Sequence, residues 1–289
     1  MRVGKVSGMQ VGQPSRTAMA VARARAHHQV AEEPRVFTDP LALQIIGESG
    51  LQANEFDNGL DQDLARRRRL FIAARSRFAD DTVAAAVARG TGQVVILGAG
   101  LDTTAYRNTH EDVRFFEVDH PDTQEWKRRR LSDTGIAIPS SLTFAPIDFE
   151  QSTLADGLAE AGLDRARSAV FIWLGVVMYL TTTSVEDTLR YIAGHSGPSE
   201  VVFDYLYPVS STSPDPSAGQ QQATVDRVAA VGEPWLSFFT ADEIRGNLLS
   251  LGFNRVEDRS ATKLLATYGI RTTARPMNSG PHLIHACTA

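Results

Sequence analysis

Apolar residues recur along this chain with two different spacings. In residues 15–33, 41–47 and 64–89 they recur every three to four positions, which predicts helices with one buried face. After residue 90 they gather instead in short runs that are separated by further helical patterns. Runs of this kind are typical of strands that helices cover on both faces. The pattern predicts an α/β fold in which a helical region, residues 15–90, precedes a sheet.

The short apolar runs define the strands of the expected sheet. The first five alternate with predicted helices, as in a parallel sheet with crossover connections. The last two lie near the end of the chain, and we expect them to form an antiparallel pair at one edge. The predicted strands are residues 94–97, 113–118, 142–147, 169–173, 200–206, 261–267 and 283–287.

The remaining stretches have the composition of loops and tails. Residues 1–14 are polar and rich in glycine, so we expect a flexible N-terminus. Residues 210–222 are rich in Ser, Pro, Gly and Gln, which predicts a surface loop within an insert at about residues 208–240. We expect residues 15–289 to form a single domain, of which residues 91–289 hold the sheet.

A glycine-containing turn follows the first predicted strand directly. Gly98-Ala99-Gly100 lets the backbone approach a ligand where larger side chains would block it. A helix is predicted next, and the second strand ends at Asp119. The distance from Gly98 to Asp119 is close to the roughly 20 residues that separate a glycine turn from an acid that binds a ribose. Glu117, on the same side of that strand, is the alternative acceptor. The segment predicts half of a nucleotide-binding unit.

The residues after this turn favour S-adenosylmethionine over a dinucleotide. A dinucleotide motif has a third glycine where this chain has Thr103, and its pyrophosphate lies over the helix N-terminus. Asp102 would repel a pyrophosphate, whereas S-adenosylmethionine carries an ammonium and a sulfonium. No Gly-Lys-Ser/Thr follows this strand, which excludes a Walker loop. The alternative interpretation is structural: a tight turn in which Asp102 only caps the helix.

Composition and charge narrow the class of protein. A net charge of −5 over 289 residues argues against nucleic acid as the main partner. The basic clusters at residues 66–69 and 127–130 lie in helical patterns and are interpreted as solvated helix faces. The only cysteine, Cys287, excludes an intramolecular disulfide and fits a reducing compartment. Neither a signal peptide nor a run long enough to span a bilayer is found, so we expect a soluble, cytoplasmic protein without a membrane partner.

Residues at the ends of other strands are further candidates for the site. Asp148 and Phe149 end the third strand, where they either hold an adenine ring or serve as a helix cap and a core residue. His120, Tyr179 and Tyr205 lie near strand ends and could orient or deprotonate a substrate, although such residues more often belong to the core or the rim. No cluster of Cys, His and acidic residues has the spacing of metal ligands, so no metal is expected.

Several of these segments together resemble the leucine carboxyl methyltransferase family. The matching segments are LGAGLDTTAYR, FFEVDHP, PIDFE and WLGVVMYLT, with TAMAVARARA…FTDPLA near the start and EPWLSFFTADEI…LGF near the end. They are most similar to the family's bacterial branch of S-adenosylmethionine-dependent methyltransferases, which includes O-methyltransferases of secondary, polyketide-type metabolism. The resemblance covers most of the chain. It implies a class I methyltransferase domain, with a doubly wound, seven-stranded, Rossmann-like sheet and an N-terminal helical addition.

The resemblance also implies roles for individual residues. Arg75, in IAARSRF, matches the arginine that pairs with the cofactor's carboxylate, an interaction that a planar guanidinium suits. Leu174 stands where leucine carboxyl methyltransferases have a glutamate near the methionine end of the cofactor. This departure argues against a protein C-terminal leucine as the substrate. By the same resemblance the cofactor lies on Gly98, and its ribose and adenine are held by Asp119, Asp148 and Phe149.

The sequence therefore predicts an S-adenosylmethionine-dependent O-methyltransferase that acts on a carboxylate, or on a phenol or other hydroxyl, of a small molecule. A carboxylate needs no base, whereas a phenol or an alcohol needs one. A nucleotide-dependent oxidoreductase is the first alternative, against which Asp102 and Thr103 argue. A non-catalytic protein that binds S-adenosylmethionine is the second, and Leu174 is its main support.

Overall fold

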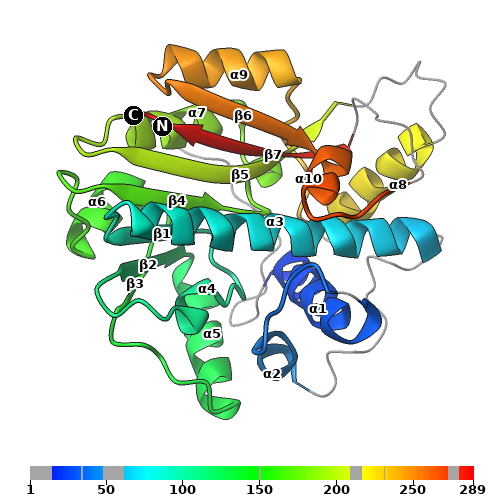
Figure 1. The fold of residues 1–289 in the computed structure, drawn as a ribbon, viewed down its shortest axis with the longest axis horizontal. Helices are drawn as coiled ribbons and strands as arrows, with labels where there is room; N and C mark the ends of the chain where they lie inside the picture. The colour runs from blue at the N-terminus through cyan, green and yellow to red at the C-terminus, as the bar shows by residue number, and fades with distance from the viewer. Residues whose placement is uncertain are drawn as a thin grey trace.

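A seven-stranded sheet organises the molecule (Figure 1). The structure is a computed structural model that describes residues 15–33, 35–47, 62–149, 151–208, 217–230, 232–272 and 280–289. The expected flexible segment, residues 1–14, lies outside them. The strands stand in the order β3-β2-β1-β4-β5-β7-β6. They are β1 (Gln93–Leu97), β2 (Arg114–Asp119), β3 (Leu142–Pro146), β4 (Ala169–Trp173), β5 (Ser199–Tyr207), β6 (Arg255–Ser260) and β7 (Gly280–Cys287).

The topology confirms the predicted doubly wound sheet. β1 pairs in parallel with β2 and β4, β2 pairs with β3, and β4 pairs with β5. β7 is antiparallel to both β5 and β6, which confirms the antiparallel C-terminal edge. The strand order reverses between β1 and β4. Ligands of open α/β sheets bind in the crevice outside the carboxyl ends of the strands at such a reversal, and the glycine turn after β1 lies there.

Helices cover both faces of the sheet because its central strands are apolar on each side. Every residue of β1 and of β4 is buried. α3 packs on one face and crosses the sheet in Figure 1, whereas α6, α7 and α9 pack on the other. The helices are α1 (Arg16–Ala31), α2 (Ala42–Ile46), α3 (Gln62–Ala88), α4 (Thr104–Arg107), α5 (Pro121–Asp133), α6 (Leu154–Glu160), α7 (Thr182–Ala193), α8 (Ser217–Ala230), α9 (Ala241–Ser250) and α10 (Ala261–Thr267).

The N-terminal helices confirm the predicted helical addition. Ser15 caps α1 as expected, because its side chain accepts a hydrogen bond from the N–H of Ala18 at 3.2 Å. α1 packs against α2 and α3. A Cβ built on Gly100 would lie 3.3 Å from the Cβ of Ala18, so α1 also lies directly against the glycine turn. The addition thus forms a wall at the carboxyl end of β1.

The predicted strand at residues 261–267 is wrong, because this segment is helix α10. Ser260 caps the helix by accepting from the N–H of Lys263 at 3.4 Å, and Leu264 and Leu265 are buried in the core beneath α3. The edge strand that pairs with β7 is β6 instead. Sequence analysis missed β6 because Val256 is the lone apolar residue in its sequence, RVEDRS.

The predicted surface loop at residues 210–222 is wrong in its second half. α8 begins at Ser217 and includes Gln222. Ala and Gln in this half have higher helix propensity than the Ser and Pro residues that precede them. Residues 209–216 lie outside the described part of the chain.

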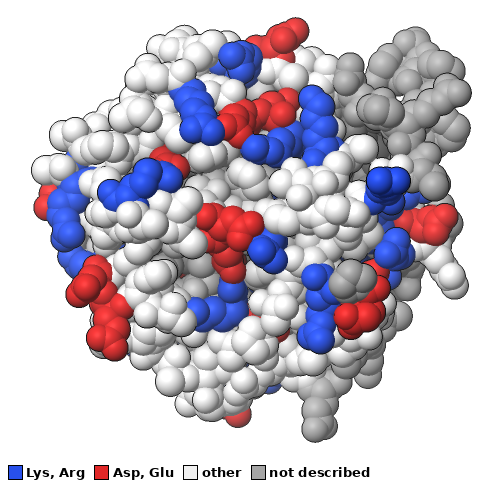
Figure 2. Space-filling model, viewed as in Figure 1, with Lys and Arg blue, Asp and Glu red and all other residues white. Residues whose placement is uncertain are grey.

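The described surface carries charges of both signs. Figure 2 shows Lys and Arg side chains interspersed with Asp and Glu over the face in view. The interpretation of residues 127–130 as a solvated helix face is wrong for Lys127, which is only 1% exposed. No helix among the described residues combines the length and the apolar character needed to cross a membrane.

Candidate cofactor and active site

The turn after β1 requires glycine for two reasons. Gly98 and Gly100 have φ angles of 62° and 45°, in the left-handed region that side chains disfavour. A Cβ built on Gly98 would also lie 2.5 Å from Cγ2 of Val176, in the segment that follows β4. The N–H of Ala99 donates to the carbonyl of Val118 on β2 at 3.0 Å. The turn therefore packs closely against the segment after β4 at the point where the strand order reverses.

Asp119 closes this turn from the end of β2. Its Oδ2 accepts from the N–H of Gly100 at 2.6 Å, and its Oδ1 accepts from the N–H of His120 at 2.7 Å. Burial raises the pKa of the Asp119 carboxyl, although the hydrogen bond from Gly100 favours the charged form. The structure thus brings together two features that the sequence predicted separately, the glycine turn and the acid.

We expect the substitution Asp119→Ala to weaken binding of S-adenosylmethionine by about 1–3 kcal/mol, because a buried acceptor and its partners are lost. Titration calorimetry measures the change. Asp122→Ala is the matched control, since Asp122 is a more exposed acid in the following helix. An affinity that Asp119→Ala leaves unchanged would mean that another residue binds the ribose.

Glu117, the alternative acceptor, is held away from any ligand. Its side chain is 0% exposed, and both carboxylate oxygens lie 2.8 Å from Nζ of Lys127. The hydroxyl of Tyr106 donates to Glu117 at 3.3 Å. Burial raises the pKa of Glu117 to about 7 against the opposing effect of Lys127. Nζ of Lys127 also donates to the carbonyl of Asp102 at 2.8 Å, so the ion pair is bonded directly to the backbone that follows the glycine turn.

Asp102 lies one residue before Thr103, which is the N-cap of the short helix α4, and its side chain binds the first helical N–H. Its Oδ1 accepts from the N–H of Thr104 at 2.7 Å. Its Oδ2 lies 3.9 Å from Nη1 of Arg25, on α1. Burial by itself raises the pKa of Asp102, but Arg25 and Lys127 outweigh it, so the net shift is downward and the carboxylate stays ionised. The amide that a pyrophosphate would use is therefore occupied by a charged carboxylate.

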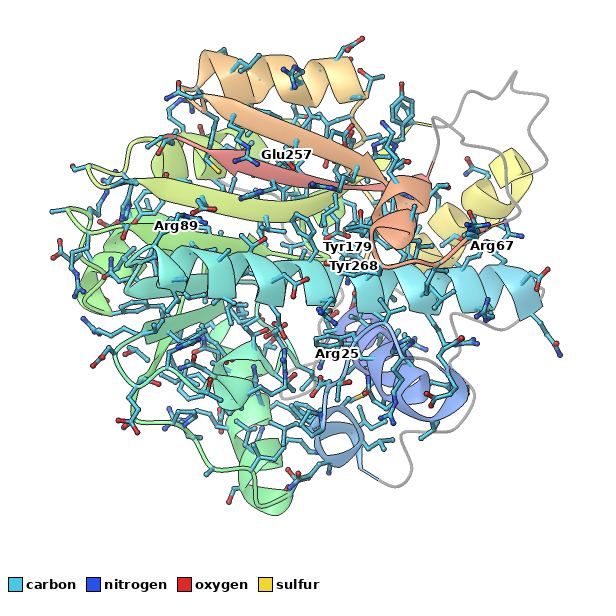
Figure 3. The ribbon with its side chains drawn as sticks, viewed as in Figure 1. Arg25, Arg67, Arg89, Tyr179, Glu257 and Tyr268 are labelled. Atoms are coloured by element: carbon cyan, nitrogen blue, oxygen red, sulfur yellow. The ribbon has the colours of Figure 1, made fainter. Side chains whose placement is uncertain are left out.

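Sequence analysis missed the residues that fasten α1 to this turn. Arg25 lies below α3 (Figure 3) and donates to the carbonyl of Leu101 at 2.7 Å. Its Nε lies 3.4 Å from Oδ2 of Asp39, which also accepts from the hydroxyl of Thr103 at 2.7 Å. The signal was present: an arginine inside an alanine-rich helix, and an aspartate within FTDPLA, are polar residues at positions expected to be buried.

Arg75 lies beside the segment that follows β4, where the cofactor's carboxylate is expected. One of its terminal nitrogens pairs with Asp204 on β5, and the other oxygen of Asp204 accepts from the N–H of Gly175 at 2.6 Å. A Cβ built on Gly175 would lie 3.0 Å from Nη2 of Arg75. Nε of Arg75 has no hydrogen-bond partner among the described residues. Arg75 is thus connected to the segment that contains Leu174, which is half-buried against the core beneath α3.

The third strand end is open enough for a ring to stack there. Phe149 is 51% exposed, so it is not the core residue of the structural alternative. Asp148 is half-buried, and its Oδ2 accepts from the side-chain amide of Gln151 at 2.6 Å. The carbonyl of Asp119 accepts from the N–H of Ile147 at 2.9 Å, so this strand end lies next to the acid that closes the turn.

The three candidate catalytic residues lie in different parts of the fold and have different contacts. His120 caps α5, because its Nδ1 accepts from the N–H of Asp122 at 3.3 Å. Tyr179, at the end of the short helix η2 (Val177–Tyr179) (Figure 3), is half-buried beside Thr17 of α1, and burial raises its pKa. Tyr205 is fully buried, and its hydroxyl donates to Asp258 at 3.1 Å. Burial also raises the pKa of Tyr205, so neither tyrosine is ionised near neutral pH.

The structure also assembles a cluster that the sequence pattern did not indicate. Ligand-type atoms of Glu200, His285 and Cys287 lie within 4.8 Å of one another, because β5 and β7 pair only in the folded chain. Nε2 of His285 lies 2.9 Å from one oxygen of Glu200, and Arg89 pairs with the other. This network of hydrogen bonds and an ion pair accounts for the cluster without an ion.

Comparisons with known proteins show the family to which the chain is related. A family model described as leucine carboxyl methyltransferase matches residues 18–193. The Bacillus subtilis protein "Putative S-adenosyl-L-methionine-dependent methyltransferase YktD" is 31% identical over 271 residues, which cover 84% of this chain and 88% of that protein. A protein of the same description from Mycolicibacterium paratuberculosis is 32% identical over 219 residues, which cover 71% of this chain and 69% of that protein.

Solved structures share the fold at low sequence identity. A Thermobifida fusca structure, titled as that of a "putative methyltransferase", aligns with a TM-score of 0.56 at 17% identity and covers 96% of both chains. A DUF574 family protein from Streptomyces avermitilis also aligns with a TM-score of 0.56, at 15% identity, over 92% of this chain and 95% of that one. Both alignments extend over nearly the whole chain, so the fold is shared.

Proposed function

Because this chain belongs to the leucine carboxyl methyltransferase family, with S-adenosylmethionine as its cofactor, we propose that it methylates an oxygen atom of a small molecule. The acceptor is a carboxylate, or a phenol or other hydroxyl. The observation that carries the proposal is the turn at Gly98, which Asp119 closes and after which Asp102 occupies the N–H of Thr104 with a carboxylate.

The residues present fit this cofactor. The bare backbone of residues 98–100 allows close contact, and Asp119 is placed to accept from a ribose diol. Phe149 offers an exposed ring for the adenine, with Asp148 beside it as an acceptor. Arg75 retains a buried N–H without a partner among the described residues, which suits the cofactor's carboxylate.

Bound S-adenosylmethionine supplies an electrophilic methyl group on a sulfonium. The protein's task is to align an acceptor oxygen with that methyl group and to exclude water. α1 contributes to the exclusion, because Ala18 lies against Gly100 and Arg25 bonds to the carbonyl of Leu101. A hydroxyl acceptor must also lose its proton, so it needs a base that a carboxylate acceptor does not.

A nucleotide-dependent oxidoreductase fits the turn less well. A pyrophosphate would need free amides at the N-terminus of a helix with a substantial dipole. α4 has 4 residues, and Asp102 already accepts from the N–H of Thr104. Leu174 in place of a glutamate leaves a non-catalytic binding protein as the second alternative.

Two measurements test the proposal. Titration calorimetry should show binding of S-adenosylmethionine and of its demethylated product, and no binding of NAD. Methyl-release turnover with a library of small phenols, alcohols and carboxylic acids should then identify acceptors. Preferential binding of NAD would support the oxidoreductase, and tight binding of S-adenosylmethionine without any turnover would support the non-catalytic alternative.

A further inference from the structure

Three neighbouring strands bring a tyrosine, a histidine and an aspartate together at the ligand end of the sheet. Tyr205 is opposite His282 in the pairing of β5 with β7, and Ser260 of β6 is opposite His282 on the other side. β5 ends at Tyr207, two residues beyond Tyr205, and β7 begins two residues before His282. Since β5 is parallel to β4, this end of the three strands is the edge at which the sheet binds ligands.

His282 and Asp258 are arranged as a base and the carboxylate that orients it. Nδ1 of His282 lies 3.0 Å and 3.1 Å from the two carboxylate oxygens of Asp258. A carboxylate only accepts, so in the neutral imidazole Nδ1 carries the proton and the lone pair is on Nε2. Nε2 is buried and has no hydrogen-bond partner among the described residues, although the His282 side chain as a whole is paired. His282 is 5% exposed.

Nδ1 of His28 and both ring nitrogens of His195 are also buried without a partner among the described residues, but of these three histidines only His282 has its other ring nitrogen against a carboxylate. A buried polar atom without a partner costs free energy, and native structures tolerate few such atoms without a functional reason. The rings of Tyr205 and Tyr207 pack beside the imidazole, with centroids 5.3 Å and 5.4 Å away, and hold its orientation. Nε2 is therefore a basic atom in a fixed place that the rest of the described chain leaves unused.

The cluster is connected to the glycine turn through the segment after β4. Val176 packs against the same core cluster as Tyr205, and it is the residue that a Cβ on Gly98 would contact. The residue before Tyr205, Asp204, binds the N–H of Gly175 in that segment. The segment that follows β4 thus lies against the strand that holds Tyr205.

We propose that His282, oriented by Asp258, is the base that accepts the proton of a hydroxyl acceptor, so that the substrate is a phenol or an alcohol rather than a carboxylate. The proposal rests on the methyl-transfer function proposed above. The acceptor's O–H bond breaks and its proton moves to Nε2 as the oxygen forms a bond to the methyl carbon. The carbon–sulfur bond breaks at the same time, and its electron pair stays on sulfur. The imidazolium that results is stabilised by the carboxylate of Asp258.

The charged and titratable groups that face His282 come from two neighbouring strands. Asp258 faces it from β6, and the phenols of Tyr205 and Tyr207 face it from β5. Nε2 can accept a proton only when it does not already carry one, so kcat/KM for a hydroxyl acceptor should fall toward acid pH.

The test compares His282→Gln and Asp258→Asn with His285→Gln, a control on the opposite face of the same strand. In the first two variants we expect kcat with hydroxyl acceptors to fall by about 100- to 10,000-fold, and the acidic limb of the pH profile to disappear. Affinity for S-adenosylmethionine, measured by calorimetry, should stay within about 3-fold of the wild type and also reports that each variant is folded. His285→Gln should keep its turnover.

The possible failures are distinguishable. Full turnover of hydroxyl acceptors by His282→Gln with normal cofactor affinity would overturn the dyad alone. So would a wild-type protein that methylates only carboxylic acids. A wild-type protein that does not bind S-adenosylmethionine would overturn the proposed function and the dyad with it.

Discussion

Replacing Gly98 by valine is expected to abolish binding of S-adenosylmethionine while the sheet remains folded. The new Cβ would lie 2.5 Å from Cγ2 of Val176, and the residue would have to keep a φ of 62°. Relief of either conflict moves the backbone on which the cofactor is proposed to lie. Calorimetry measures the binding, and thermal unfolding followed by circular dichroism reports on the fold.

Gly135→Val is the matched control for this variant. Gly135 has a φ of 67°, close to that of Gly98, but a Cβ there would meet nothing within 4 Å. It should lose about 1–2 kcal/mol of unfolding free energy to backbone strain and bind the cofactor normally. If Gly98→Val bound S-adenosylmethionine as tightly as Gly135→Val does, the cofactor would not lie against the turn.

Lys127→Met should lower the free energy of unfolding by about 3–5 kcal/mol, because it leaves the carboxylate of Glu117 buried and uncompensated. Nζ of Lys127 lies 2.8 Å from both oxygens of Glu117, and the two side chains are 1% and 0% exposed. The carbonyl of Asp102 also loses its donor, so cofactor affinity should fall as well. Denaturant unfolding and calorimetry measure the two effects.

The double variant Lys127→Met with Glu117→Gln separates the causes. This variant removes the buried charge, so most of the lost stability should return. The carbonyl of Asp102 still lacks its donor, so the loss of cofactor affinity should remain. Arg129→Met is the control on the same helix, since Arg129 forms an exposed pair with Glu125 and should change stability by less than about 0.5 kcal/mol. Equal losses for Lys127→Met and Arg129→Met would show that the buried pair does not hold the turn.

Both predictions concern the glycine turn and its surroundings, which are the part of the molecule that the sequence predicted most accurately. The turn at Gly98, the acid at Asp119 and the strands around them were predicted from local patterns, and in the structure the N–H of Gly100 in that turn donates to Asp119. Local patterns succeed here because a glycine at positive φ and a buried strand are decided by neighbouring residues. Lys127 was misjudged, although its position four residues before the buried Leu131 puts it on the inner face of α5.

The end of the chain shows why the same reasoning failed elsewhere. β6 contains charged residues at positions where a buried strand normally has apolar ones, because Asp258 is paired with His282 and Tyr205. A periodicity argument has no access to such pairing, since the partners come from two other strands. It therefore assigned the edge to residues 261–267, whose leucines are buried on one side of a helix.

The sequence by itself determined the α/β class, the order of the central strands along the chain, the glycine turn and the acid that closes it. Only the tertiary structure decided which polar groups meet: Arg25 with Asp102, Lys127 with Glu117, and His282 with Asp258. The physical reason is that side-chain periodicity encodes which residues avoid water. The partner of a buried polar group is fixed only when distant segments close around it, because the cost of burial is offset at that moment by the specific hydrogen bonds and ion pairs then formed.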